Sequence, residues 1–154
     1  MKKLTAISGM LALLLFPTPC FTMMSEQEQT RNLLCLIAQR YTDFLSQFGQ
    51  EEPGDLRPSM ATLFAADCIK IVNDKVVSRS PEELYTQVSG AKNDIGLWAV
   101  NKKKPFIVDP TYNTVVAHYE IPTQNKGTLL VMKFLVCDKQ GRIQKIDEVF
   151  TTLN

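Results

Sequence analysis

The chain has 154 residues and a formal net charge of +1, from 17 basic and 16 acidic side chains. This length accommodates one domain with its own hydrophobic core. Because nucleic-acid binding requires a clear basic excess, the balanced charge excludes nucleic acid as the main partner. A short basic run at 102–104 indicates a solvated turn or a sheet edge protected by lysines, with a patch for an anionic partner as the alternative.

The N-terminal segment has the pattern of a secretory signal peptide. Two lysines precede an uncharged apolar run at 4–16, which is too short for a membrane span of roughly 20 residues. Small residues predict cleavage after Thr22, which gives a signal peptide at 1–22 and one mature domain at 23–154. The alternatives are a lipoprotein acylated at Cys20 and an uncleaved anchor. We therefore expect a periplasmic or secreted protein of bacterial type, with no stable membrane span after cleavage.

A long helix is predicted at the start of the mature chain. Ser25 and Glu28 have the spacing of a capping box, and Gly49 is typical of a helix end. Apolar residues recur between them at steps of three and four, which predicts one buried face: Leu34, Ile37, Tyr41, Phe44 and Phe48.

Two shorter helices are predicted further along the chain. The first covers about 58–65, where a proline suits the first helical turn. The second begins at the capping box of Ser80 and Glu83 and continues past residue 88. Gly90 and Gly96 leave its end open.

The remaining segments have the alternation or the apolar runs of strands. Two short strands at 68–72 and 75–78 are joined by an Asn-Asp turn, and further strands are expected at 106–108 and 114–121. A C-terminal hairpin at 128–150 has a nearly continuous apolar first arm. This order predicts an α+β fold in which helices gather on one side of a strongly curved antiparallel sheet.

Three short segments, taken with this order, resemble the nuclear transport factor 2-like superfamily. They are Leu-Phe-Ala-Ala-Asp at 63–67, Gly-Arg-Ile at 141–143 and Asp-Glu-Val-Phe at 147–150. The resemblance covers nearly the whole mature chain and includes the SnoaL-like polyketide cyclases and the ketosteroid isomerases. It implies a cone-shaped sheet wrapped by helices around an apolar pocket, often a homodimer formed through the outer sheet face. Many members of this superfamily bind or assemble without catalysis.

The ketosteroid isomerase branch is not matched at its proton-transfer positions. Tyr41 lies in a stretch that resembles the one carrying the oxyanion-hole tyrosine. The two aspartates would fall near Val72 or Asn73 and near Lys133. Val72 cannot accept a proton, Lys133 has the wrong charge, and Asp74 would require the turn to shift by two residues. Since proton transfer requires a base within hydrogen-bond reach, steroid isomerisation is not expected.

Few polar residues remain as candidates for a site. Lys133 either faces solvent or lies at the pocket, where it would bind an anion or act as a base. If buried, it is expected to pair with Asp147 on the neighbouring strand or to lose its proton. Tyr41, Lys133 and Asp147 are therefore the candidates for catalysis. Aromatic residues are candidates for lining the pocket, with plain core packing as the alternative: Tyr41, Phe64, Trp98 and Tyr119.

Histidine and cysteine do not indicate a metal site. His118 is the single histidine and shares the expected outer face of its strand with Glu120. Cys35, Cys68 and Cys137 have apolar neighbours and are expected to be small buried hydrophobes. If a disulfide forms, Cys68–Cys137 is the expected pair. We expect neither a metal nor a cofactor.

Two function classes stay open. The favoured one is an exported, non-catalytic domain that binds a small apolar ligand or interacts through its sheet. The alternative is a SnoaL-like isomerase, cyclase or hydratase that acts on a hydrophobic carbonyl compound. They differ in whether two or more titratable side chains point into one apolar pocket.

Overall fold

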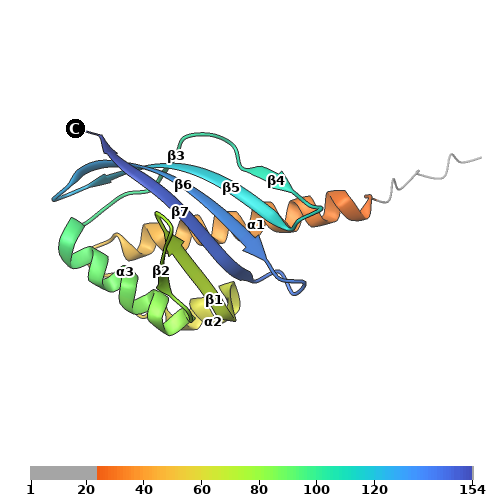
Figure 1. Cartoon of the computed structure of the whole chain (residues 1–154), viewed down its shortest axis with the longest axis horizontal. Helices are drawn as coiled ribbons and strands as arrows, with labels where there is room; N and C mark the ends of the chain where they lie inside the picture. The colour runs from red at the N-terminus through yellow and green to blue at the C-terminus, as the bar shows by residue number, and fades with distance from the viewer. Residues whose placement is uncertain (1–23, 154) are drawn as a thin grey trace, which may run out of the picture.

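A computed structural model describes residues 24–153 as three helices and one seven-stranded sheet (Figure 1). The predicted signal peptide at 1–22 lies outside these residues. The helices are α1 (Glu26–Phe48), α2 (Arg57–Leu63) and α3 (Pro81–Ile95). The strands are β1 (Phe64–Val72), β2 (Lys75–Ser78), β3 (Asn101–Lys102), β4 (Ile107–Asp109), β5 (Thr114–Thr123), β6 (Gly127–Cys137) and β7 (Ile143–Leu153).

The helices lie on one side of a curved sheet, as Figure 1 shows, which confirms the predicted α+β class. The strand order is β2-β1-β7-β6-β5-β3, and β4 also pairs with β5. Within residues 24–153, no helix is both long and apolar enough to cross a membrane.

Both predicted N-caps, Ser25 and Ser80, are confirmed. The hydroxyl of Ser25 accepts a hydrogen bond from the backbone N–H of Glu28 at 3.2 Å, and Ser80 accepts one from Glu83 at the same distance. Helix α3 continues through Gly90 and ends at Gly96, whose φ of 73° lies in the left-handed region. The apolar stripe of α1 is buried as predicted: Leu34, Ile37, Tyr41, Phe44 and Phe48.

Helix α2 ends two residues earlier than predicted. Phe64 has extended backbone angles and pairs with Ile143 of β7, so the chain passes directly from α2 into β1. The apolar residues at 64–65 are compatible with a helix or with a strand, and in the structure the pairing of β1 with β7 makes them a strand.

The expectation of an entirely antiparallel sheet is wrong for one pair of strands. β5, β6 and β7 are antiparallel neighbours, but β1 and β7 are parallel. These two strands are far apart in the chain, so no tight turn forces them into opposite directions. The Asn73-Asp74 turn between β1 and β2 is confirmed, with φ values of 45° and 65° that suit a two-residue hairpin.

The sequence did not predict β3, a two-residue edge strand that pairs with β5. Lys102 of the basic run lies in this exposed edge, in agreement with the edge interpretation of that run.

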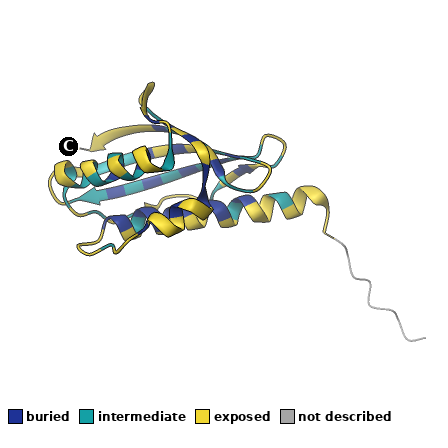
Figure 2. Cartoon of the chain, turned by 90° about the horizontal axis from the view of Figure 1, so that it is seen from below, coloured by how far each residue is buried: buried dark blue, intermediate teal, exposed yellow. Residues whose placement is uncertain are grey.

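The core lies between the helices and the inner face of the sheet (Figure 2). Along β5, the residues on one face are buried and His118 and Glu120 lie on the other, as predicted from the alternation. Cys68 and Cys137 are buried free thiols, so the alternative of a disulfide is wrong. β7 lies between the two strands that carry them, and two strand spacings of roughly 4.8 Å exceed the reach of a disulfide.

Candidate functional site

The pairing of β6 with β7 brings Lys133 opposite Glu148. Their side chains form an ion pair in which Lys133 Nζ lies 2.5 Å from Glu148 Oε2. Lys133 is 3% exposed, so the expectation of a solvent-facing lysine is wrong. The expected pair with Asp147 is also wrong, because Asp147 lies on the opposite face of β7 and pairs with Lys145 at 3.3 Å. Successive residues of a strand face opposite sides of the sheet, so Glu148 faces Lys133 and its neighbour Asp147 does not.

A second buried lysine shares the same carboxylate. Lys70 lies on β1, beside β7, with its Nζ 3.3 Å from Glu148 Oε2. It also donates a hydrogen bond to Gln87 Oε1 of α3 at 3.0 Å. We call Lys70, Lys133 and Glu148 the ionic cluster. All three are buried, and they come from three adjacent strands.

Sequence reasoning did not single out Lys70 or Glu148, although the signal was present. Lys70 is two residues from the buried Cys68, and Glu148 is two residues from the buried Ile146. Period-two spacing therefore places both on the inner face. A charged residue on that face is informative, because buried charges need a partner.

Helix α1 supports the ionic cluster through Tyr41. Lys133 Nζ donates a hydrogen bond to the Tyr41 hydroxyl at 3.0 Å and lies 5.2 Å from the centre of its ring. Burial raises the pKa of Tyr41 above its ordinary value, so the phenol stays neutral. The neighbouring Thr42 hydroxyl is 2.8 Å from that of Tyr119 on β5, which forms a second polar link between α1 and the sheet. Burial raises the pKa of Tyr119 to about 12.

The charges of the cluster keep Glu148 ionised. Burial alone would raise the pKa of Glu148, but the charges of Lys133 and Lys70 and their hydrogen bonds outweigh it and lower the pKa to about 2. A carboxylate with so low a pKa is a weak base near neutral pH. Glu148 therefore provides a fixed negative charge beside the two lysines.

The ionic cluster lines a pocket of about 350 Å³ between α3 and the inner face of the sheet. The charges of the cluster are buried, whereas Asp94 and Lys126 form an exposed ion pair at 3.4 Å on the same pocket. The cluster therefore occupies the inner end and the Asp94–Lys126 pair the solvent end. The walls between them are mostly apolar: Leu45, Val72, Val88, Ala91, Ile95, Trp98, Ile121, Leu129, Val131 and Phe150.

The four aromatic candidates occupy different places. Trp98 lines the pocket and donates a hydrogen bond from its indole Nε1 to the Leu45 carbonyl oxygen at 3.0 Å. Tyr41 lies behind Lys133, and Tyr119 lies in the core with its hydroxyl at Thr42. Phe64 packs edge-on against Tyr41, with ring centres 6.1 Å apart.

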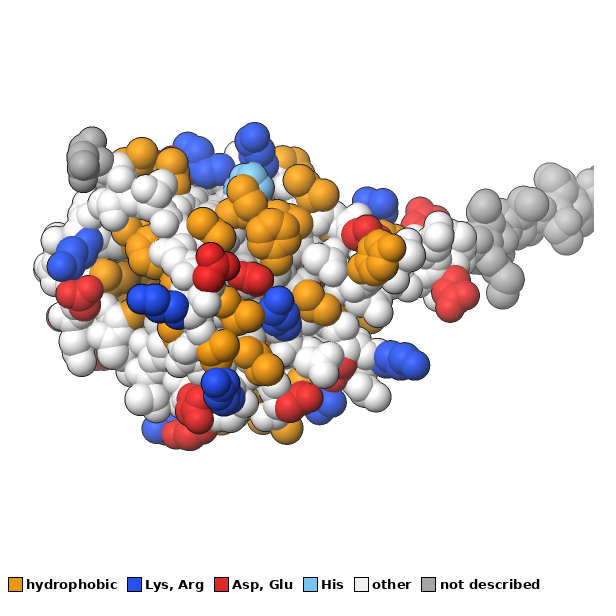
Figure 3. Space-filling view, viewed as in Figure 1, with side chains coloured by type: hydrophobic (Ala, Val, Ile, Leu, Met, Phe, Trp, Pro, Cys, Tyr) orange, Lys and Arg blue, Asp and Glu red, His pale blue; other side chains and the backbone are white. Residues whose placement is uncertain are grey.

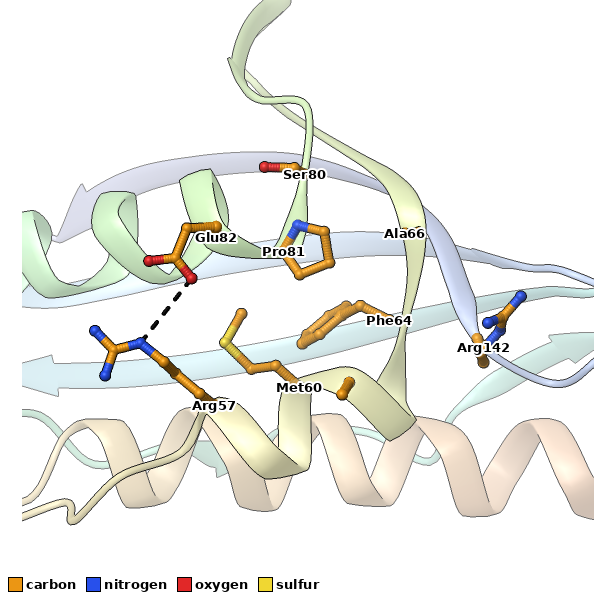
Figure 4. Close-up of a pocket in the computed structure, with 9 residues that line it drawn as sticks. Arg57, Met60, Phe64, Ala66, Ser80, Pro81, Glu82 and Arg142 are labelled. Atoms are coloured by element: carbon orange, nitrogen blue, oxygen red, sulfur yellow. Dashed lines mark ion pairs between the residues drawn. The ribbon is translucent and has the colours of Figure 1, made fainter.

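A second hollow of about 450 Å³ lies between α2, β1 and the start of α3 (Figure 4). Met60, Phe64 and Pro81 face into it, and Arg57 pairs with Glu82 at its side. More than half of each of these two charged side chains is exposed, at 55% and 73%. Because its charges are solvated, this hollow has no buried polar group with which to select a ligand.

The outer face of the sheet carries exposed apolar side chains. Figure 3 shows hydrophobic groups gathered over this face near the single histidine, His118. The exposed members on β6 and β7 include Met132, Phe134 and Val149. Among residues 24–153, no three histidine, cysteine or acidic side chains are arranged to hold a metal ion.

No protein-family model and no curated protein sequence matches the chain. Solved structures match its fold. The BvnE pinacolase from Penicillium brevicompactum has a TM-score of 0.65 and 15% identity, over 84% of this chain and 88% of its own. An isomerase candidate of the SnoaL-like family from Agrobacterium tumefaciens strain C58 has a TM-score of 0.64 and 11% identity, over 78% and 98%.

A nuclear transport factor 2-like protein of unknown function from Exiguobacterium sp. 255-15 has a TM-score of 0.62 and 13% identity, over 75% of this chain and 98% of its own. These similarities show that the chain has the nuclear transport factor 2-like fold. Identities this low establish the fold alone, and a fold of this kind hosts many functions.

Proposed function

We propose that this protein is a non-catalytic binding domain that holds a small, largely apolar ligand in the pocket between α3 and the sheet. The observation that carries the proposal is an apolar-walled pocket of about 350 Å³ with buried charges at its inner end. Ligand pockets typically measure about 300–1,000 Å³ and combine apolar walls with a few polar groups. A ligand at the lower end of this size range fits.

The ionic cluster meets one condition of the enzyme alternative, because three titratable side chains converge on one pocket. Its electrostatics favour binding instead. General acid–base catalysis is most effective with a pKa near the working pH. The pKa of Glu148 is about 2, and the raised pKa of Tyr41 keeps its phenol neutral. Neither group is tuned to transfer a proton from a carbonyl compound.

Ligand binding can be followed by fluorescence from Trp98, the only tryptophan, which lines the pocket. We expect small apolar alcohols and ketones to change its emission in a saturable way and to be recovered chemically unchanged. Ala91→Phe fills the pocket from α3 and should abolish the change. Asn93→Phe is the matched control, because Asn93 is exposed on the same helix and should leave binding intact. Conversion of a bound ketone to a new product would refute the non-catalytic assignment.

A second observation favours self-association. The outer sheet face carries a group of exposed apolar residues on two adjacent strands, and contiguous exposed apolar surface often marks an interface. We propose that two copies of the chain pair through this face. The interface would leave the ligand pocket accessible, because the pocket lies on the opposite side of the sheet.

We also propose that the domain acts after export, as the pattern of residues 1–22 indicates. The intact mass of protein recovered from an exporting host should place the new N-terminus between Phe21 and Ser25. A diacylglyceryl group on Cys20 would instead identify a lipoprotein.

A further inference from the structure

The charges around the pocket are unbalanced. Two buried lysines of the ionic cluster share one buried carboxylate, and both approach the same oxygen, Glu148 Oε2. At the solvent end, Lys126 is matched by Asp94. The inner end therefore has one positive charge in excess, in surroundings where an unpaired charge is costly.

The hydrogen-bond donors of the two lysines are also incompletely used. A lysine ammonium has three N–H donors and no acceptor. Lys133 directs two of them to Tyr41 and Glu148, whereas Lys70 directs one to Gln87 and forms an ion pair with Glu148 at 3.3 Å. Among the described residues, at least one donor on each lysine has no hydrogen-bond acceptor. The two ammonium groups contact one common oxygen, so they lie close together, and both lysines line the pocket.

We infer that the ligand is a small monocarboxylate with an apolar body, bound with its carboxylate at Lys70 and Lys133 and its body along the apolar walls. A carboxylate has two oxygens for the two remaining donors, and its single charge matches the excess of one positive charge. A phosphate monoester has up to two negative charges, which exceeds what the cluster compensates. This inference rests on the proposed function, since it names the ligand class of the same pocket.

Glu148 is a positioning residue in this arrangement. It holds both lysines at one place before the ligand arrives, and it competes with the ligand for their donors. Replacing its carboxylate by a neutral amide should therefore strengthen carboxylate binding. A catalytic or ligand-anchoring acid would show the opposite response.

The test measures the affinity of the purified protein for octanoate, octanol, octylamine and octyl phosphate through the fluorescence of Trp98. These probes share one apolar body and differ in the head group. Octanoate should bind at least about tenfold more tightly than octanol, as expected for charge-assisted hydrogen bonds. Octylamine should bind more weakly than octanol, because its ammonium would face two lysines.

Variants separate the roles of the cluster. Lys133→Met should lower octanoate affinity by about tenfold while leaving octanol affinity within about twofold. Lys70→Met should lower octanoate affinity by a similar factor, and it replaces Lys133→Met in the test if that variant does not fold. Lys75→Met is the matched control, because Lys75 is exposed on β2 outside the pocket. Glu148→Gln should raise octanoate affinity and leave octanol affinity unchanged.

The outcomes distinguish this inference from the proposal on which it rests. If octanoate binds no more tightly than octanol, or if octylamine or octyl phosphate binds best, the monocarboxylate assignment is refuted and the binding function stands. If Glu148→Gln loses octanoate binding, the assigned role of Glu148 is refuted. If none of the four probes binds, the binding function fails together with the inference.

Discussion

Glu148 should make the free energy of unfolding depend on pH in the acidic range. Its pKa is about 2 in the folded protein, against an ordinary value of 4.5. At about 1.4 kcal/mol for each pKa unit, this difference corresponds to a contribution on the order of 3 kcal/mol to the free energy of unfolding. Because the folded-state pKa is the lower of the two, the contribution is fully present above about pH 4.5 and is lost as the pH falls toward about 2.

Urea unfolding of the native protein and of Glu148→Gln, between roughly pH 6 and pH 2.5, measures this contribution. The native protein should be more stable than Glu148→Gln at about pH 6, and this difference in the free energy of unfolding should shrink by on the order of 2–3 kcal/mol as the pH falls to about 2.5. Asp147→Asn is the control, because Asp147 forms a partly exposed pair with Lys145 and should change the pH profile by less than about 0.5 kcal/mol. An advantage of Glu148 that stays constant with pH would refute its ion pairing with the two lysines.

Other predictions concern packing, backbone and assembly. Phe44→Ala should lower the free energy of unfolding by about 3–5 kcal/mol, because Phe44 is buried in the core, whereas the exposed Arg40→Ala should stay within about 0.5 kcal/mol in the same urea assay. Gly96→Ala should be destabilising, since φ is +73° and a Cβ would lie 2.7 Å from Gln124 Cβ. Gly90→Ala should raise the melting temperature, because it lies inside α3 with open space around it. Val149→Lys on the outer sheet face should convert a dimer to a monomer in light scattering, and an unchanged dimer mass would place the interface elsewhere.

The local elements could be predicted from the sequence because their signals are local. The capping pairs at Ser25 and Ser80 each depend on residues three positions apart, and the buried stripe of α1 depends on helical spacing. The alternation along β5 likewise placed His118 on the outer face. In each case, neighbours in the chain carry all the information needed.

The ionic cluster could not be predicted in the same way, because its members meet through long-range strand pairing. Lys133 was expected to pair with Asp147, and the register of β7 selects the next residue, Glu148. Lys70 joins through the parallel pairing of β1 with β7, which nothing in the sequence of either strand specifies. The pocket was predicted only as a general consequence of the fold, without its two-lysine inner end.

The position of Glu148 between two lysines also bears on how the chain reaches its native strand alignment. A slip of β7 by one residue would turn Glu148 outward and would turn Lys145 and Asp147 inward, so that a third lysine would be buried beside Lys70 and Lys133 with one carboxylate. The same slip would turn the buried Ile146 toward solvent, so the ionic and apolar penalties act together against misalignment. The cluster thus discriminates between correct and shifted pairings of β7 with both of its neighbours. It would contribute to the uniqueness of the folded state even with the pocket empty.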